Sequence, residues 1–267
     1  MQRLARAQAA RQTAAMNMPP LPCMSPLQQH WPLPLDLPGA VLVSGQFEPS
    51  LLAFEDFALS GIEPPASIQR SVAKRQAEFL AGRVCARAAL LALDGTAQVP
   101  EIGEDRAPVW PSHVSGSITH GNGWAAAVVA QKAHWRGLGL DVETVMKAAR
   151  AERLAGEILT PAELGRLTGD IGLAVTLTFS LKEALFKALY PLVGQRFYFE
   201  HAEIVEWHSD GHARLRLLTD LSEEFRHGAV LHGQFSRQGE HLLSLVSVPG
   251  VAVMGSARNG PPRAPGS

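Results

Sequence analysis

The stretch "FSLKEALFKALYP", residues 179–191, places charged side chains inside an apolar run. Helical spacing puts Leu181, Leu185, Ala188 and Leu189 on one face. Glu183 and Lys187 stand four residues apart, so they share the opposite face. The spacing therefore predicts a helix over residues 173–190 that buries one side and presents a Glu–Lys pair on the other.

The charged face of this helix has two interpretations. An exposed ion pair on a solvated helix is the ordinary one. Phe186 and Tyr190 flank the pair, however, so we expect its surroundings to be only partly open to water. In the second interpretation the helix lines a cleft, with Glu183 directed at a metal ion and Lys187 at a phosphate.

A second charged stretch, "GLDVE", lies in a predicted strand over residues 135–145. Side chains alternate along a strand, so Leu140 and Val142 point one way while Asp141 and Glu143 point the other. Two like charges at this spacing repel unless a cation lies between them. Mg²⁺ is the natural candidate, because it prefers carboxylate and phosphate oxygens. The alternative is an exposed strand end with ordinary acids.

Residues 64–95 predict a long helix or a helix pair, with a stop signal at Asp94-Gly95. Arg75 and Arg83 fall on its apolar stripe, which is formed by Ile68, Val72, Phe79, Ala86 and Leu90. The two arginines either extend their charged heads to water from buried stems or bind an anion with several phosphates.

Composition limits the class of protein. The chain has 267 residues, 46% of them hydrophobic and 18% charged, with a formal charge of −1. It can bury a core, and near-neutrality argues against a general nucleic-acid binder. Its two cysteines form neither a disulfide framework nor a zinc motif, which fits a cytoplasmic protein. No apolar run reaches the ~20 residues that a membrane span needs.

The order of predicted elements indicates an α+β protein of two similar lobes. Helices followed by strands occur in each half, and a pseudo-twofold pair of lobes would leave a cofactor cleft between them. We expect four segments: a disordered leader at 1–24, an N-terminal lobe at 25–133, a C-terminal lobe at 134–250 and a disordered tail at 251–267. The basic leader also resembles a targeting segment.

Four blocks in this order resemble the single-chain, two-lobed 4′-phosphopantetheinyl transferases, and the enterobactin-synthetase branch most of all. The blocks are "KRQAEFLAGRVCARAAL" (74–90), "RAPVWPSHVSGSITH" (106–120), "GLGLDVE" (137–143) and "FSLKEALFKA" (179–188). The spacing of the last two is specific. The resemblance implies transfer of the 4′-phosphopantetheine arm from coenzyme A to a serine of an acyl or peptidyl carrier protein, with release of 3′,5′-ADP. The two-lobed form resembles a built-in dimer, so we expect a monomer. The near-neutral charge and the lack of a long apolar run predict no nucleic-acid or membrane partner.

The resemblance also implies roles for individual residues. Asp141, Glu143 and Glu183 match the acids of the family's Mg²⁺ site, and Glu183 matches the acid proposed to accept the serine proton. Lys187 matches the lysine at the phosphate under attack. The implied coenzyme A contacts are Arg75, Arg83, Arg106, Thr119 and His120. Thr119 replaces the family's usual serine, and Leu140 replaces the isoleucine of its GIDIE-like pattern.

The residues alone are also compatible with two other functions. Another Mg²⁺-dependent phosphate enzyme would explain the acids and arginines, but not the "FSLKEALFKA" block. A non-catalytic relative that only binds carrier proteins would not need the acids.

Overall fold

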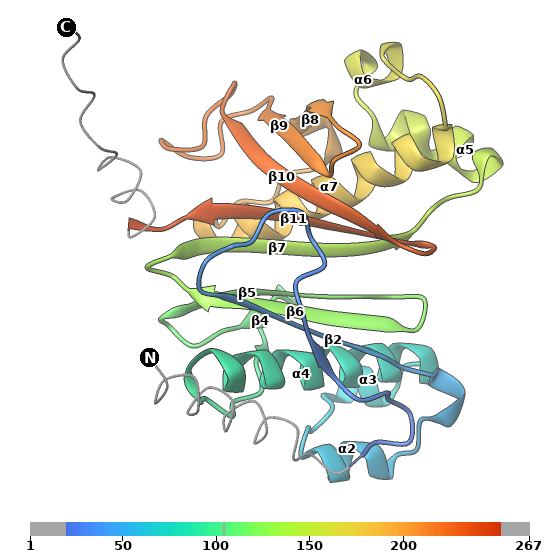
Figure 1. The fold of residues 1–267 in the computed structure, drawn as a ribbon, viewed down its shortest axis with the longest axis vertical. Coiled ribbons are helices and arrows are strands. Elements are labelled where there is room, and N and C mark those ends of the chain that lie inside the picture. The colour runs from blue at the N-terminus through green and yellow to red at the C-terminus, as the bar shows by residue number, and fades with distance from the viewer. Residues whose placement is uncertain (1–19, 104, 252–267) are drawn as a thin grey trace, which may run out of the picture.

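The computed structural model describes residues 20–103 and 105–251, and they form two lobes that each place one long helix on an antiparallel sheet (Figure 1). The first sheet has the order β1-β2-β6-β5, and a short hairpin β3-β4 accompanies it. The elements of this lobe are β1 (Gln28–Gln29), β2 (Ala40–Gln46), η1 (Pro49–Leu51), α2 (Glu55–Ser60), α3 (Ala66–Gln69), α4 (Ala73–Asp94), β3 (Glu101–Ile102), β4 (Pro108–Val109), β5 (Val114–Gly121) and β6 (Trp124–Gln131).

The second lobe repeats this plan with more strands. Its sheet has the order β7-β11-β10-β9-β8. In both lobes the first long strand is followed by helices and pairs antiparallel with the last strand of that lobe, β2 with β6 and β7 with β11. The elements are β7 (Trp135–Thr144), α5 (Ala148–Ile158), α6 (Pro161–Gly165), α7 (Ile171–Val193), η2 (Phe199–His201), β8 (Ala202–Trp207), β9 (His212–Leu217), β10 (Val230–Gln238) and β11 (His241–Pro249).

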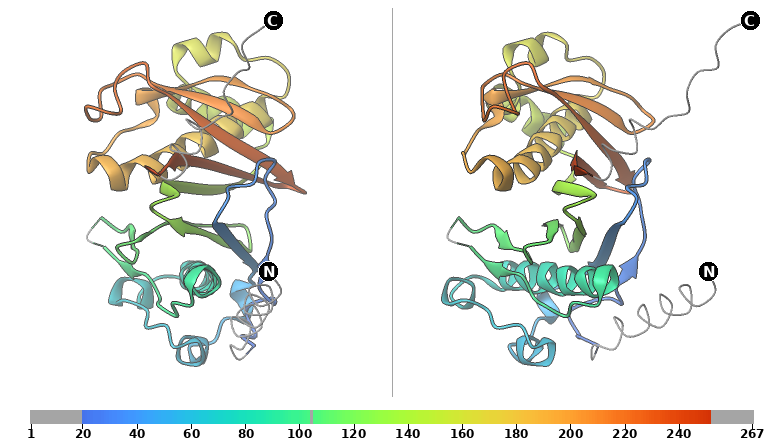
Figure 2. Two further views of the ribbon diagram at one scale, coloured as in Figure 1. Left: turned by 60° about the vertical axis from the view of Figure 1, so that its left-hand side comes forward. Right: turned by 90° about the vertical axis from the view of Figure 1, so that its left-hand side faces the viewer.

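The two sheets face each other, and the long helices cover their outer sides (Figure 2). Alternation along β6 produces this arrangement, because Ala125, Ala127 and Val129 pack against α4 while Ala126 and Val128 face the other sheet. The core between the sheets also contains Leu138, Leu140 and Val142 of β7. The predicted α+β class is confirmed, and the inward direction of Leu140 and Val142 agrees with the strand pattern.

Serine and threonine side chains join the lobes where β5 meets β7. The backbone N–H groups of Leu140 and Val142 donate to Ser117 Oγ (2.9 Å) and Thr119 Oγ1 (3.0 Å). Ser115 Oγ–H donates to the carbonyl of Trp135. These hydroxyls replace a backbone ladder between two edge strands, so they satisfy buried groups that would otherwise lack partners.

One boundary differs from the sequence prediction. The predicted leader extends to residue 24, but Leu21 and Cys23 are buried and pack with Phe57 and Ile62, so the packed chain begins earlier. Residues 1–19 and 252–267 lie outside the described residues. The chain passes from one sheet to the other between β6 and β7, where we set the lobe boundary.

The helix predicted over residues 64–95 is a pair, α3 and α4, with a break at 70–72. Ile68 therefore does not continue the stripe of α4, and Val72 is 73% exposed as the N-terminal cap of α4. The predicted stop is confirmed, because Gly95 ends α4 in the left-handed conformation with φ of 87°.

Gly139 is required where β7 crosses under α7. A Cβ atom at this position would lie 1.8 Å from the carbonyl oxygen of Ala184, so the helix would have to move. We expect Gly139→Ala to destabilise the protein by about 3 kcal/mol, at the upper end of overpacking effects. Urea unfolding measures this. Gly156→Ala is the control: its Cβ would meet nothing within 4 Å, so it should not destabilise α5.

Candidate functional site

Helix α7 positions the predicted charged pair by packing closely on β7. Its side facing β7 is a stripe of small residues at four-residue intervals. Gly172 and Thr176 contact Met146, Ala184 lies against Gly139, and Ala188 lies against Gly137. The two glycines of "GLG" therefore allow close approach of the helix. Glu183 and Lys187, next to this stripe, come to lie beside the carboxylates that follow those glycines.

Lys187 joins α7 to the acidic part of β7. Its ammonium donates to Asp141 Oδ1 (2.7 Å) and to the carbonyl oxygen of Leu140 (3.0 Å). The Asp141 side chain is buried, and its Oδ2 atom has no hydrogen-bond partner among the described residues. Lys187 itself is partly exposed, so one side of the Lys187–Asp141 pair is accessible to solvent.

The three predicted acids influence one another. The pKa of Glu143 is raised to about 7, mainly by burial and then by the charges of Asp141 and Glu183, while Lys187 opposes the shift. Burial also raises the pKa of Glu183, with Lys187 opposing and Asp141 adding to the effect. The structure thus brings Asp141, Glu143 and Glu183 into one acidic group, and Lys187 forms an ion pair with its Asp141.

The arrangement does not by itself define a metal centre. Within residues 20–103 and 105–251, no three His, Cys, Asp or Glu side chains are placed so that they could hold a metal ion. The assignment of Asp141, Glu143 and Glu183 to Mg²⁺ stays a prediction.

Basic groups of the first lobe lie close to this acidic group. Arg75 Nη1 is 3.1 Å from His120 Nε2, and both contact Glu78, at 3.5 and 3.7 Å. Burial lowers the pKa of His120, Glu78 opposes this, and the charges of Arg75 and Lys187 lower it further. His120 therefore lies between cations from both lobes, a setting that favours a bound anion.

Arg83 and Arg106 occupy different environments. Arg83 is 6% exposed, so its head does not reach water as a snorkelling residue would. Its guanidinium lies 5.2 Å from the centre of the Phe79 ring, and Nη2 donates to the carbonyl oxygen of Glu101 at 3.4 Å. Burial lowers the pKa of Arg83 to about 10, and Arg75 adds to this. Arg106 has φ of 70° and lines the cleft between the lobes.

Thr119 is placed differently from its predicted role. Neighbouring residues of a strand point to opposite sides, so Thr119 and His120 do not share a face. Thr119 is 3% exposed, and its Oγ1 accepts the N–H of Val142. This geometry gives Thr119 a structural contact at the junction of the lobes, and its contact with coenzyme A stays a prediction.

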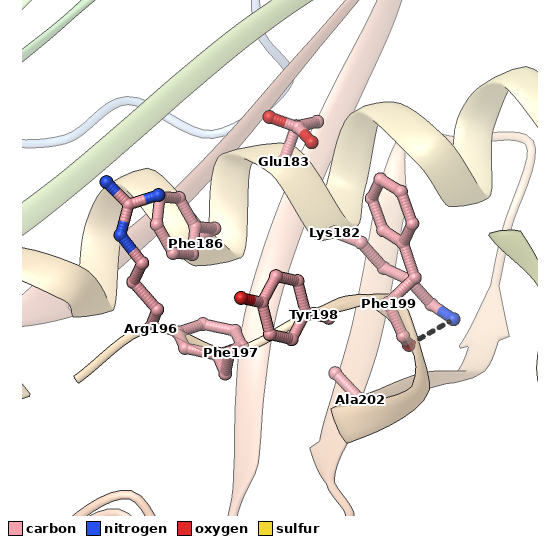
Figure 3. A pocket seen from close by; sticks show the side chains of 8 residues that line it. All are labelled: Lys182, Glu183, Phe186, Arg196, Phe197, Tyr198, Phe199 and Ala202. Carbon is pink, nitrogen blue, oxygen red and sulfur yellow. Dashed lines mark hydrogen bonds between the residues drawn. The ribbon is translucent and has the colours of Figure 1, made fainter. Parts of the chain in front are cut away.

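Two adjoining cavities meet at Glu183. The larger, about 290 Å³, lies between the lobes and is lined by Arg106, Ser117 and Trp110 from one lobe and by Glu183 and Lys187 from the other. The second cavity, about 240 Å³, is mainly aromatic (Figure 3). Its walls include Phe186, Arg196, Phe197, Tyr198 and Phe199. Glu183, Phe186 and Arg196 line both.

Sequence reasoning missed the aromatic wall at 197–199 and the role of Lys182. Lys182 is 3% exposed, and its ammonium donates to Glu163 Oε2 (2.7 Å) and to the carbonyl oxygens of Ile158 and Phe199. The Thr160-x-x-Glu163 pattern signals a capping box, and the structure contains it. That pattern gives no sign of the partner on α7.

Comparison with known proteins decides the family. The sequence model of the 4′-phosphopantetheinyl transferase N-terminal domain matches residues 63–130, and that of the 4′-phosphopantetheinyl transferase superfamily matches residues 137–246. This chain belongs to the 4′-phosphopantetheinyl transferase superfamily. It is therefore an enzyme whose activity is 4′-phosphopantetheinyl transfer, as the sequence blocks predicted.

Individual relatives agree. Enterobactin synthase component D of Escherichia coli O157:H7 is 41% identical over 158 residues, which cover 58% of this chain and 73% of the relative. The 4′-phosphopantetheinyl transferase Npt of Nocardia iowensis is 39% identical over 66% of this chain and 78% of its own. Enterobactin synthase component D of Salmonella typhi is 33% identical over 83% and 91%.

A solved structure, the holo-[acyl-carrier-protein] synthase of Thermotoga maritima, is 26% identical with a TM-score of 0.34. The match covers 43% of this chain and 63% of that chain, and the family assignment does not depend on it. No helix of the described part of the chain is long and apolar enough to cross a membrane.

The raised pKa of Glu143 predicts a pH dependence of stability. The folded carboxyl titrates near 7 and the unfolded one near 4.5, so the folded state holds the proton more strongly. Stability from this group is therefore full below about pH 4.5, falls as pH rises to about 7, and then levels off. Urea unfolding of metal-free wild type and Glu143→Gln across this range measures it. The stability of wild type relative to the variant should fall with pH, and parallel profiles would contradict the prediction.

Proposed function

We propose that this enzyme transfers the 4′-phosphopantetheine arm from coenzyme A to a serine of acyl or peptidyl carrier proteins, with Mg²⁺ and with release of 3′,5′-ADP. One observation supports this best: the cleft between the lobes joins basic groups from one lobe to the acidic group and Lys187 of the other. A nucleotide diphosphate carries negative charge that basic groups bind, and it is also a ligand of hard cations.

The basic groups fit the phosphates of coenzyme A. Arg75 and His120 lie within hydrogen-bonding distance of each other, at 3.1 Å, so both can present N–H donors to one phosphate group. Arg106 lines the same cleft as Lys187. Arg83 is held behind this surface, where its charge adds to the positive potential without open contact with solvent.

The acidic group fits Mg²⁺ by its chemistry. Asp141, Glu143 and Glu183 supply carboxylate oxygens, which are the ligands that Mg²⁺ prefers. The pKa values of Glu143 and Glu183 are raised first by burial and then by neighbouring carboxylates, and a bound cation would oppose both effects. When bound, Mg²⁺ would neutralise charge that develops on the diphosphate.

The chain's own residues then have distinct tasks. Glu183 accepts the proton of the carrier serine as its oxygen bonds to phosphorus and the bond to 3′,5′-ADP breaks. Lys187 holds negative charge on the phosphate under attack, while its contact with Asp141 keeps the ammonium in place. The aromatic cavity beside Glu183 accommodates the apolar length of the pantetheine arm.

We further propose that the protein acts as a cytoplasmic monomer on carriers of siderophore, polyketide or fatty-acid synthesis. Because the two lobes form the cleft within one chain, a second copy is not needed to complete it.

Mass spectrometry of apo carrier proteins tests the function. A fatty-acid-type and a peptide-synthetase-type carrier are incubated side by side with the enzyme, coenzyme A and Mg²⁺, with and without a chelator. We expect a mass gain of one phosphopantetheine group that depends on Mg²⁺. Turnover of coenzyme A without modification of either carrier would favour another Mg²⁺-dependent phosphate enzyme. Carrier binding without modification would favour a non-catalytic binder.

A further inference from the structure

Three buried oxygen atoms lie behind the Lys187–Asp141 pair without a partner. They are Oδ2 of Asp141 and the hydroxyl oxygens of Ser180 and Ser244, which form no hydrogen bond with any described residue. Both serines are fully buried, at 0% exposure, and Asp141 is 5% exposed. Buried polar groups are rarely left unpaired, so this group of atoms requires an explanation.

Ser244 lies directly beside Asp141. The two residues are opposite each other in the β7–β11 ladder, so their side chains share a face of the sheet. Leu242 and Val246, two positions on either side of Ser244, belong to the core packed against α7. The face shared by Ser244 and Asp141 is therefore the one that α7 covers.

Ser180 faces the same place from the helix. It belongs to the stripe Gly172–Thr176–Ser180–Ala184–Ala188, whose other four members contact either β7 or Met146, two residues after the end of β7. Ala188 lies at Gly137 and Ala184 at Gly139. Four residues of a helix rise about 6 Å along its axis, which is close to the length of two strand residues. The step from Ala184 to Ser180 on the helix therefore corresponds to the step from Gly139 to Asp141 on the strand, so Ser180 lies over Asp141.

We propose that these three oxygens bind one buried water molecule, through which Ser180 and Ser244 position the carboxylate of Asp141. An ionised carboxylate only accepts hydrogen bonds, whereas each hydroxyl donates or accepts. A water molecule with two to four polar partners donates to Oδ2 and exchanges hydrogen bonds with both serines. Oδ1 then keeps its hydrogen bond from the Lys187 ammonium and points toward the cleft. The role toward Mg²⁺ rests on the proposed function, but the water site does not.

A crystal structure and direct metal binding test this site. In wild type we expect electron density within hydrogen-bonding distance of all three oxygens. Ser180→Ala and Ser244→Ala should lose that density and weaken Mn²⁺ or Mg²⁺ binding about 10- to 100-fold, as loss of outer-shell partners does elsewhere. Ser180→Thr keeps the hydroxyl and should retain binding.

Ser236→Ala is the matched control. Its hydroxyl is also buried and unpartnered, but Ser236 follows Phe235, the β10 residue that faces α7 opposite Ser244, so it points to the other side of the sheet. It should bind metal as wild type does. The proposal is overturned if the wild-type site holds no water, or if the Ser180 and Ser244 variants bind metal like Ser236→Ala. If wild type itself modifies no carrier, the proposed function fails, and the electron density still decides the water site.

Discussion

Replacing Glu183 by glutamine should lower the turnover number for carrier modification by about 10²- to 10⁴-fold, the usual contribution of a positioned base. Glutamine keeps the shape of the side chain but cannot accept the serine proton. Because burial already disfavours the charged form of Glu183, the variant should be at least as stable as wild type at pH 7. A rate measured by mass spectrometry, together with urea unfolding, separates lost chemistry from lost structure.

Glu223→Gln provides the comparison for this variant. Glu223 is exposed on the connection between β9 and β10, and it does not line the cleft. The turnover number of Glu223→Gln should therefore equal that of wild type. Unchanged turnover in Glu183→Gln would contradict the assigned role and would revive the interpretation of the chain as a carrier binder.

Replacing Lys182 by methionine should destabilise the protein by about 3–5 kcal/mol, because it leaves a buried carboxylate without its cation. Both side chains of the Lys182–Glu163 pair are almost fully buried, at 2% and 5% exposure. The ammonium also holds the carbonyl oxygens of Ile158 and Phe199, and Glu163 holds the N–H groups of Thr160 and Ile204. Loss of this cluster would release the loop that carries the aromatic wall next to Glu183.

A second substitution shows whether the buried charge is the cause. Lys182→Met/Glu163→Gln removes the unpaired carboxylate and should recover part of the lost stability. Arg214→Met breaks an exposed pair with Glu206, so it should cost less than about 1 kcal/mol. Equal effects of the Lys182 and Arg214 substitutions on urea unfolding would show that burial is not decisive.

The side-chain directions that the sequence predicted well belong to single elements with clear periodicity. Asp141 and Glu143 share a face of β7, and Glu183 and Lys187 share a face of α7, because the backbone geometry of a strand or helix sets these directions. Features that depend on neighbouring segments were not predicted. Nothing in the sequence indicated that Thr119 accepts the N–H of Val142. Val72 was expected on an apolar stripe, but the chain breaks before α4.

The sequence alone therefore determined the α+β class, the order of the elements and the family, and it identified the charged residues of the cleft. Only the tertiary structure decided that Lys187 contacts Asp141, 46 residues away, that Lys182 is neutralised by Glu163, and that Ser244 pairs opposite Asp141 in the β7–β11 ladder. Sequence periodicity predicts the face of its own helix or strand to which a side chain belongs. The partner it meets depends on how distant segments pack, and here the glycines of β7 set that packing by allowing α7 to approach.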